Sequence, residues 1–78
     1  MPMLLLFGPV ADAAGTRKEQ IAGSSIEEVL EGALQRFGTA FAEQLGACKI
    51  WVNGDVPSPD QLLEESDEVA LLPPVSGG

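Results

Sequence analysis

The stretch SSIEEVLEGALQRF, residues 24–37, has the most regular apolar spacing in the chain, and the rest of the domain must cover its apolar side. Its apolar residues are Ile26, Val29, Leu30, Ala33, Leu34 and Phe37. This spacing places them on one face of an amphipathic helix. Ser25 and Glu28 have the spacing of a capping box, and Gly38 is placed to end the helix. Gly32 costs about 1 kcal/mol relative to alanine inside a helix, so it indicates close packing there.

Segments with strand character lie on both sides of this helix. We expect strands over residues 3–7, 18–22, 49–53, 55–56 and 68–72. Asn53-Gly54 favours a tight hairpin turn. We also expect a turn over 12–16, a short helix over 39–45 and one helical turn over 60–65. The order predicts an α+β domain over residues 1–72, with a mixed sheet packed on one main helix, and a flexible tail over 73–78.

The runs at 3–7 and 68–72 are apolar at nearly every position, which is typical of central strands covered on both faces. One helix covers only one face, so we expect an exposed apolar patch on the other. Such patches usually mark a partner site. Phe7, Val56 and Leu72 are the candidates, and for Phe7 and Leu72 a place in the ordinary core is an equal alternative.

Composition restricts the function. The 78 residues include 12 acids and 4 bases, for a net charge of −8. This charge repels nucleic acid and anionic membranes and favours a basic protein surface as partner. With no histidine and the single Cys48, zinc patterns and histidine-based triads cannot be written, so no metal site and no self-contained hydrolase is expected. We expect Cys48 to be a packed thiol and Trp51 to lie in the core or to cover the sheet.

Two further patterns bear on the environment of the protein. The apolar run near the start is short and has no preceding Lys or Arg, unlike a signal peptide. No stretch approaches the length of a membrane span. We therefore expect a cytoplasmic protein with a reduced cysteine. The acids Glu64, Glu65, Asp67 and Glu68 lack the spacing of a calcium loop and indicate a solvated face.

The segment PPVSGG, residues 73–78, is unlike the rest of the chain. Its two prolines stiffen the exit from the last strand, and its two glycines carry no side chains. The segment predicts a slim arm that could enter a narrow channel and present a carboxylate at its tip. A frayed terminus without function is the alternative.

Four segments of the sequence together resemble a known family. They are LLLF at 4–7, Gly15-Thr16, Val52-Asn53-Gly54 and, most specifically, DEVALLPPVSGG at 67–78. They resemble the ubiquitin-like sulfur carriers, and most closely the small subunits of molybdopterin synthases. The resemblance implies a β-grasp fold, in which the apolar residues of the sheet face, here Phe7, Val56 and Leu72, contact the partner proteins.

The resemblance also implies a chemistry. A partner activating enzyme uses ATP to adenylate the carboxylate of Gly78, and sulfur from a donor protein converts it to a thiocarboxylate. The tail enters the large synthase subunit and donates sulfur to the pterin precursor in molybdenum cofactor biosynthesis. The tail residues are Pro73, Pro74, Val75, Ser76 and Gly77. The chain itself binds no cofactor in this scheme and is not catalytic alone, as the small subunit of a sulfurtransferase.

Other functions stay open from the sequence alone. The chain could carry sulfur for another product, such as a thiazole, a tungsten-type pterin or a thiolated tRNA base. It could be conjugated to lysines as ubiquitin is. It could also be an interaction module whose tail is inert.

Overall fold

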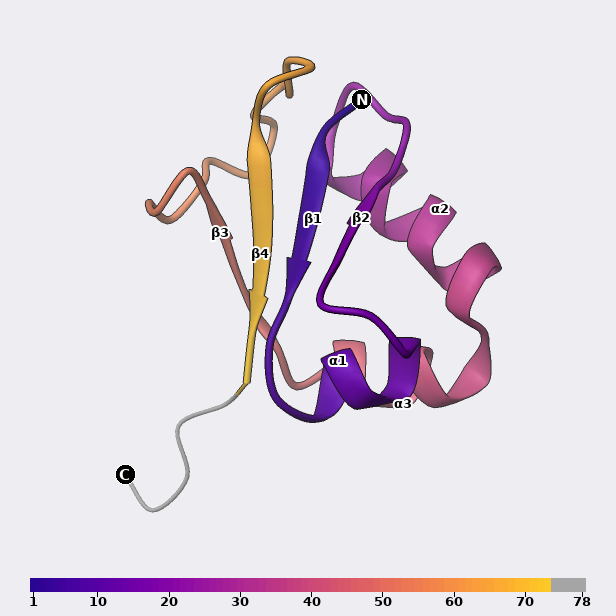
Figure 1. The fold of residues 1–78 in the computed structure, drawn as a ribbon. Helices are drawn as coiled ribbons and strands as arrows, with labels where there is room; N and C mark the ends of the chain where they lie inside the picture. Colours follow the sequence, from indigo (N-terminus) through magenta and orange to yellow (C-terminus); the bar gives the residue numbers. More distant parts are fainter. Residues whose placement is uncertain (74–78) are drawn as a thin grey trace.

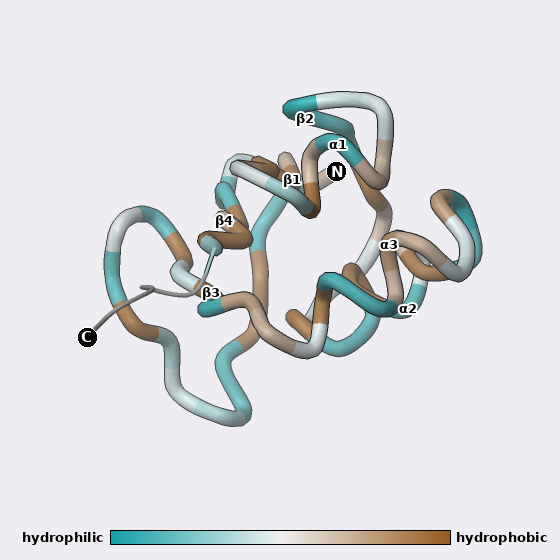
Figure 2. Tube along the Cα trace, turned by 90° about the horizontal axis from the view of Figure 1, so that it is seen from below, coloured by the Kyte–Doolittle hydropathy of each residue, from teal (hydrophilic) through white to brown (hydrophobic). Residues whose placement is uncertain are grey.

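A computed structural model describes residues 1–73 of the chain. Its elements are β1 (Met3–Leu6), α1 (Pro9–Ala14), β2 (Lys18–Gln20), α2 (Ile26–Phe37), α3 (Thr39–Leu45), β3 (Lys49–Val52) and β4 (Glu68–Leu72). The four strands form one sheet in the order β2-β1-β4-β3, with β1 and β4 parallel in the centre and antiparallel strands outside them. Figures 1 and 2 show α2 and α3 on one side of this sheet. The expected α+β class, with central strands at both apolar runs, is confirmed.

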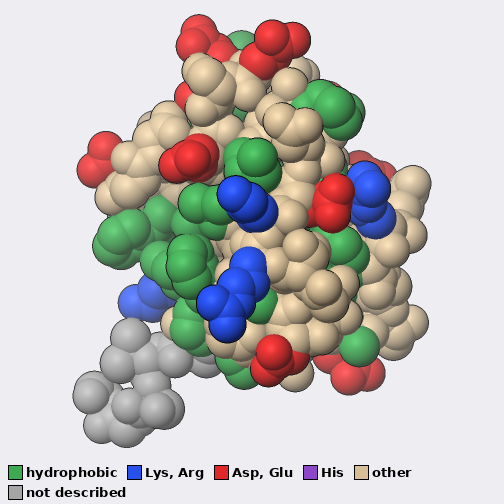
Figure 3. Space-filling view, in the orientation of Figure 1, with side chains coloured by type: hydrophobic (Ala, Val, Ile, Leu, Met, Phe, Trp, Pro, Cys, Tyr) green, Lys and Arg blue, Asp and Glu red, His purple; other side chains and the backbone are tan. Residues whose placement is uncertain are grey.

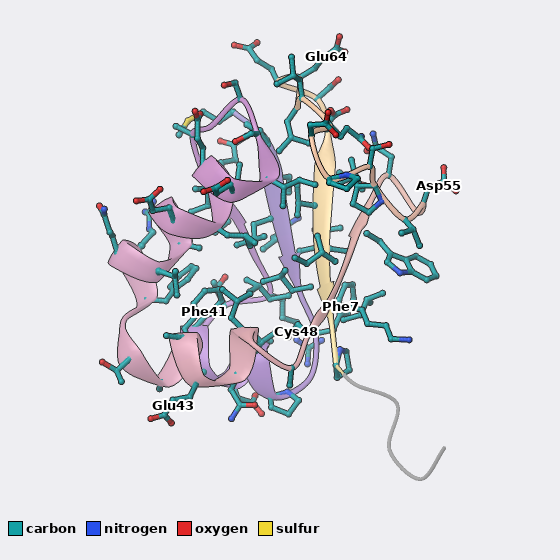
Figure 4. The ribbon with its side chains drawn as sticks, turned by 180° about the vertical axis from the view of Figure 1, so that it is seen from behind. Phe7, Phe41, Glu43, Cys48, Asp55 and Glu64 are labelled. Carbon is teal, nitrogen blue, oxygen red and sulfur yellow. The ribbon has the colours of Figure 1, made fainter. Side chains whose placement is uncertain are left out.

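Strand alternation builds the core. Leu4 lies beside Val69 and Leu6 beside Leu71 in the parallel register, and all four side chains are buried. Phe41 of α3 is fully buried in the same cluster, together with residues from α2 (Figure 4). Burying side chains of this size contributes about 1.5–3 kcal/mol each. The side chains between them in the sequence therefore point to the side of the sheet away from the helices.

The main helix begins and ends as the sequence predicts. The Glu28 backbone N–H donates to Ser25 Oγ (3.1 Å), while Glu28 Oε1 accepts from the Ser24 backbone N–H (2.8 Å) and from Ser24 Oγ (3.1 Å). These hydrogen bonds favour the charged carboxylate and lower the pKa of Glu28. A Cβ added at Gly32 would lie 2.9 Å from Ile21 Cγ2, which confirms the close packing inferred from that glycine.

Two short elements differ from the sequence prediction. Residues 9–14 form α1 where we expected a turn over 12–16: Pro9 occupies the first turn, and Gly15 ends the helix at φ 78°. The helical turn expected over 60–65 is wrong. Leu62 bridges Ser25, and the Leu63 backbone N–H donates to the Ser24 carbonyl (2.8 Å), because this extended path lets Leu63 bury its side chain.

The expected hairpin after β3 is present but short. Asn53 and Gly54 both have positive φ, 52° and 84°, which is the signature of a tight two-residue turn. The strand expected at 55–56 is reduced to a single bridge between Val52 and Asp55. Among the helices of residues 1–73, none combines the length and the apolar character needed to cross a membrane.

Candidate functional site

The side of the sheet away from the helices is an apolar surface, which we call the open face. Alternation and register assign to it the following side chains: Met3 and Leu5 of β1 and Phe7 just beyond it, Ala70 and Leu72 of β4, and Trp51 of β3. Phe7 is 45% exposed and Trp51 is 38% exposed, while Leu5 and Leu72 are half-buried. Figure 3 shows hydrophobic side chains gathered on this face. The exposed apolar patch expected from the strand pattern is therefore confirmed.

The three residues predicted for this patch do not all lie together. Phe7 follows Leu6, which pairs with Leu71, so Phe7 lies beside Leu72 at the end of the two central strands. Val56 is 78% exposed but lies beyond the hairpin turn, next to Asp55. Figure 4 shows Asp55 at the tip of this hairpin, away from Phe7. The structure thus places Phe7 and Leu72 at one end of the open face and Val56 toward the other.

Trp51 is an aromatic residue of this face that was expected from the sequence in the core or over the sheet, and was not assigned to the patch. It pairs with Ala70 and is exposed on the open face rather than lying in the core. The signal was present in the sequence: Trp51 alternates with Ile50 and Val52, and Val52 is buried on the helix side. Period-two alternation alone was enough to place Trp51 on the outer side.

The exit of the tail lies at the Phe7 end of the open face. Leu72 ends β4, and Pro73 packs on the bend between β1 and α1. A Cβ added at Gly8 would lie 3.3 Å from both Cβ and Cγ of Pro73. Gly8 has φ 64° and ψ −142°, a region that is essentially restricted to glycine. Gly8 therefore allows Pro73 to come close, and this contact positions the start of the tail. The other predicted tail residues, Pro74, Val75, Ser76, Gly77 and Gly78, lie outside the described residues.

A groove of about 600 Å³ opens beside this exit. Phe7 and Leu5 form apolar parts of its wall, and Arg17, Lys18 and Asp12 contribute charged groups. The Leu6 backbone N–H donates to the Arg17 carbonyl (2.8 Å), which fixes the segment before β2 against β1. The groove thus joins an aromatic surface to two cations within reach of the tail exit.

Two kinds of reactive group are relevant among the described residues, a metal cluster and an activated cysteine. No cluster of three His, Cys, Asp or Glu side chains suited to a metal occurs among residues 1–73. Cys48 is half-buried, its Sγ donates to the Gln44 carbonyl (3.4 Å), and burial raises the pKa of its thiol. A raised pKa leaves less thiolate and hence a poor nucleophile. This agrees with the packed thiol predicted for Cys48.

The acidic groups near the hairpin have a structural role. The Glu64 backbone N–H donates to Asp67 Oδ2 (2.8 Å), and Asn53 Nδ2 donates to Asp67 Oδ1 (2.9 Å). These bonds lower the pKa of Asp67 because they stabilise its charged form. The Glu68 backbone N–H donates in turn to Asn53 Oδ1 (2.9 Å), so the cluster links the hairpin to the start of β4. These hydrogen bonds hold the hairpin and the loop before β4 in place.

The chain matches a family model described as the ThiS family over residues 4–78. No match was found among curated protein sequences. Among solved structures, it is similar to small archaeal modifier protein 1 from Methanosarcina acetivorans, with a TM-score of 0.86 and 27% identity, over 99% of this chain and 95% of that chain.

Two further similar structures come from molybdopterin converting factors. One is a putative subunit 1 from Pyrococcus furiosus, with a TM-score of 0.79, 27% identity and coverage of 95% of this chain and 97% of that chain. The other belongs to a complex of subunits 1 and 2 from Helicobacter pylori, with a TM-score of 0.73, 29% identity and coverage of 99% of this chain and 97% of that chain. These neighbours are ubiquitin-like, so the expected β-grasp fold is confirmed.

The contact between Gly8 and Pro73 leads to a prediction. Gly8→Ala should lower the free energy of unfolding by about 1–3 kcal/mol, because alanine does not tolerate this backbone conformation and its Cβ meets the Pro73 ring. Gly15→Ala is the control: its φ is also positive, 78°, but nothing lies within 4 Å of an added Cβ. Urea unfolding measures the first effect. Amide NMR should show the Leu72 signal moving in Gly8→Ala and staying in place in Gly15→Ala; an unmoved Leu72 signal in both would contradict the contact.

Proposed function

This chain belongs to the ThiS family of ubiquitin-like sulfur carriers, and we propose that it is the sulfur carrier subunit of a molybdopterin synthase. The observation that carries the proposal is the path of β4. This central strand ends at Leu72 beside an exposed apolar face, and the sequence continues after it as Pro-Pro-Val-Ser-Gly-Gly. The similarity to converting-factor subunits at 27% and 29% identity supports the same pathway.

In this proposal the reacting group is the carboxylate of Gly78. A carboxylate is a poor electrophile because its negative charge repels nucleophiles. An activating enzyme transfers the AMP of ATP to one carboxylate oxygen and releases pyrophosphate. A sulfide-level sulfur, supplied by a donor protein, then attacks the acyl carbon; the bond between that carbon and the AMP oxygen breaks, and AMP leaves with the oxygen. The product is a thiocarboxylate on Gly78.

Delivery of the sulfur depends on geometry. The thiocarboxylate is a soft nucleophile, and the tail carries it into the large subunit. There its sulfur bonds to a carbon of the pterin precursor and displaces an oxygen leaving group. Water then hydrolyses the resulting thioester, which leaves the sulfur on the pterin and restores the Gly78 carboxylate. Gly77 and Gly78 have no Cβ, so the acyl carbon can come close to the nucleotide and later to the pterin. General acids and bases for both steps come from the partners, since this chain supplies only the positioned reacting group: the acyl carbon of Gly78 in the first step and its thiocarboxylate sulfur in the second. ATP binds the activating enzyme, and the chain acts in the cytoplasm without a cofactor of its own.

We propose that these partners bind the open face. Phe7 and Leu72 lie next to the tail exit, so a protein that covers them has the start of the tail at its surface. Trp51 extends the same face across β3, and Val56 extends the contact past the hairpin. Exposed aromatic side chains of this kind are frequent anchors in protein interfaces.

A second function has its own support. The TM-score of 0.86 is to a small archaeal modifier protein, so a ubiquitin-like modifier is the alternative. Both functions begin with adenylation of Gly78 and differ in the acceptor, a pterin precursor in one and an amine in the other. Sulfur carriage to a thiazole or a tRNA base shares the thiocarboxylate but requires another acceptor enzyme.

The tip of the tail can be tested by mass. The purified chain, incubated with the activating enzyme of the same organism, ATP and sulfide, should gain the mass that results when sulfur replaces one oxygen. Fragment-ion mass spectrometry should place the change on Gly78. A chain lacking Gly78, and one extended by an uncleaved residue after it, should fold identically and gain no mass. An unmodified natural chain under conditions that load a known carrier would contradict the proposal.

The open face can be tested by binding. Phe7→Asp should weaken binding to the large synthase subunit by roughly tenfold or more, because an aromatic anchor is lost and a charge must be desolvated. Leu62→Asp is the matched control, since Leu62 is a large apolar residue with 74% exposure, in the loop that pairs with Ser25. Calorimetry measures binding and circular dichroism measures folding. Equal affinity of the two variants, or an unfolded Phe7→Asp, would place Phe7 outside the docking surface.

A further inference from the structure

The few cations of this acidic chain are unevenly placed. Lys and Arg together number 4 against 12 acids. Arg36 pairs with Glu19 at the outer edge of the sheet (3.4 Å). The other three, Arg17, Lys18 and Lys49, are exposed and lie around the open face; we call them the basic rim. Figure 3 shows Lys and Arg side chains set among the hydrophobic ones on this face, with acidic side chains both on the face and around its margins.

The register places Lys49 at the tail-exit end of the face and Lys18 one row further in, level with Leu5 and Trp51. Lys18 lies opposite Leu5 on β2, and Lys49 lies opposite Leu72 on β3. Arg17 lines the groove beside Phe7. This is the end where the tail leaves the domain. Asp12 is the acid that lines the same groove, and Glu68 lies at the other end of the face, opposite Met3.

We propose that the open face docks an acidic surface: a protein partner that presents carboxylates around an apolar centre, facing Arg17, Lys18 and Lys49. This inference rests on the proposed function, in which partner proteins bind the open face, and it names the chemistry of the partner surface. The net charge of the chain predicts a basic partner surface, and this proposal replaces that expectation for the open face. A docked surface senses mainly the charges within about 10 Å at 0.1 M salt, and at this end of the face those are predominantly positive.

The physical effect is on orientation as much as on affinity. A partner with carboxylates near its apolar pocket is attracted to the tail-exit end of the face and repelled by the acids elsewhere on the chain. It therefore meets the sheet in the one orientation that puts the tail at its surface. Each exposed ion pair adds little by itself, so the apolar centre supplies most of the affinity and the rim supplies the direction.

The test uses two synthetic probes, a short peptide of leucines and glutamates and its counterpart of leucines and lysines. Each is titrated into the isotope-labelled chain, with amide NMR to locate binding and the fluorescence of Trp51, the only tryptophan, to follow it. The glutamate peptide should shift the amides of Phe7, Lys18 and Leu72. The lysine peptide should leave these in place. Binding of the lysine peptide at these amides, or no shift of them by the glutamate peptide, would overturn the proposal.

A matched pair of variants separates the rim from net charge. Lys18→Gln combined with Lys49→Gln, and Gln35→Glu combined with Gln44→Glu, each lower the net charge by two, and all four positions are exposed. Lys18→Gln with Lys49→Gln should lower the affinity for the glutamate peptide by about two- to tenfold. Gln35→Glu with Gln44→Glu should leave that affinity unchanged within about twofold. Equal weakening in both would overturn the proposal.

These probes involve no sulfur chemistry. A chain that binds the glutamate peptide but never gains a thiocarboxylate would refute the proposed function and leave the acidic docking surface standing. A chain that is loaded with sulfur but binds the lysine peptide at Phe7 would support the proposed function and refute the acidic docking surface.

Discussion

The parallel pairing of β1 with β4 determines how the other parts of the molecule are arranged. It places Leu4 beside Val69 and Leu6 beside Leu71, and these four side chains form the apolar surface of the sheet against which α2 and α3 pack. Because alternate residues of a strand point to opposite faces, the same pairing places Leu5, Phe7 and Leu72 outside. It also brings the ends of both central strands together, so the chain leaves the sheet where the bend at Gly8 receives Pro73. Core, open face and tail exit thus follow from one register.

A one-sided sheet of this size has a functional consequence. Residues 1–73 have apolar side chains on both faces of the sheet but helices on only one of them, which leaves Phe7 exposed beside the tail exit and Trp51 exposed further along the face. Three described groups have a shifted pKa, and each has a structural role. Glu28 caps a helix, Asp67 accepts hydrogen bonds that hold the hairpin, and Cys48 is a packed thiol. In the proposed mechanism, the domain is therefore a handle that positions a reactive terminus, and the partners provide the catalytic groups.

Much of this architecture could be predicted from the sequence. The apolar spacing of residues 26–37, the Ser25 cap and the run at 68–72 are local signals, and each was confirmed at its predicted place. Helix α1 was missed because six residues hold too little periodicity to be separated from a turn. The path of 60–65 was missed because it depends on burial of Leu63 beside Ser24, a contact distant in sequence. The basic rim could not be foreseen from composition, since it arises only when the folded sheet brings Lys18, Lys49 and Arg17 to one face.

If this chain hands sulfur from Gly78 to a pterin while the partner holds its open face, a single turnover shows the transfer itself. The chain is prepared with a Gly78 thiocarboxylate, mixed with the large subunit and the pterin precursor, and followed by mass spectrometry. We predict that the thiocarboxylate reverts to carboxylate as sulfur appears in the pterin. A thiocarboxylate that persists through the reaction, or a Gly78 joined to a lysine amine, would show that this chain is not the sulfur donor.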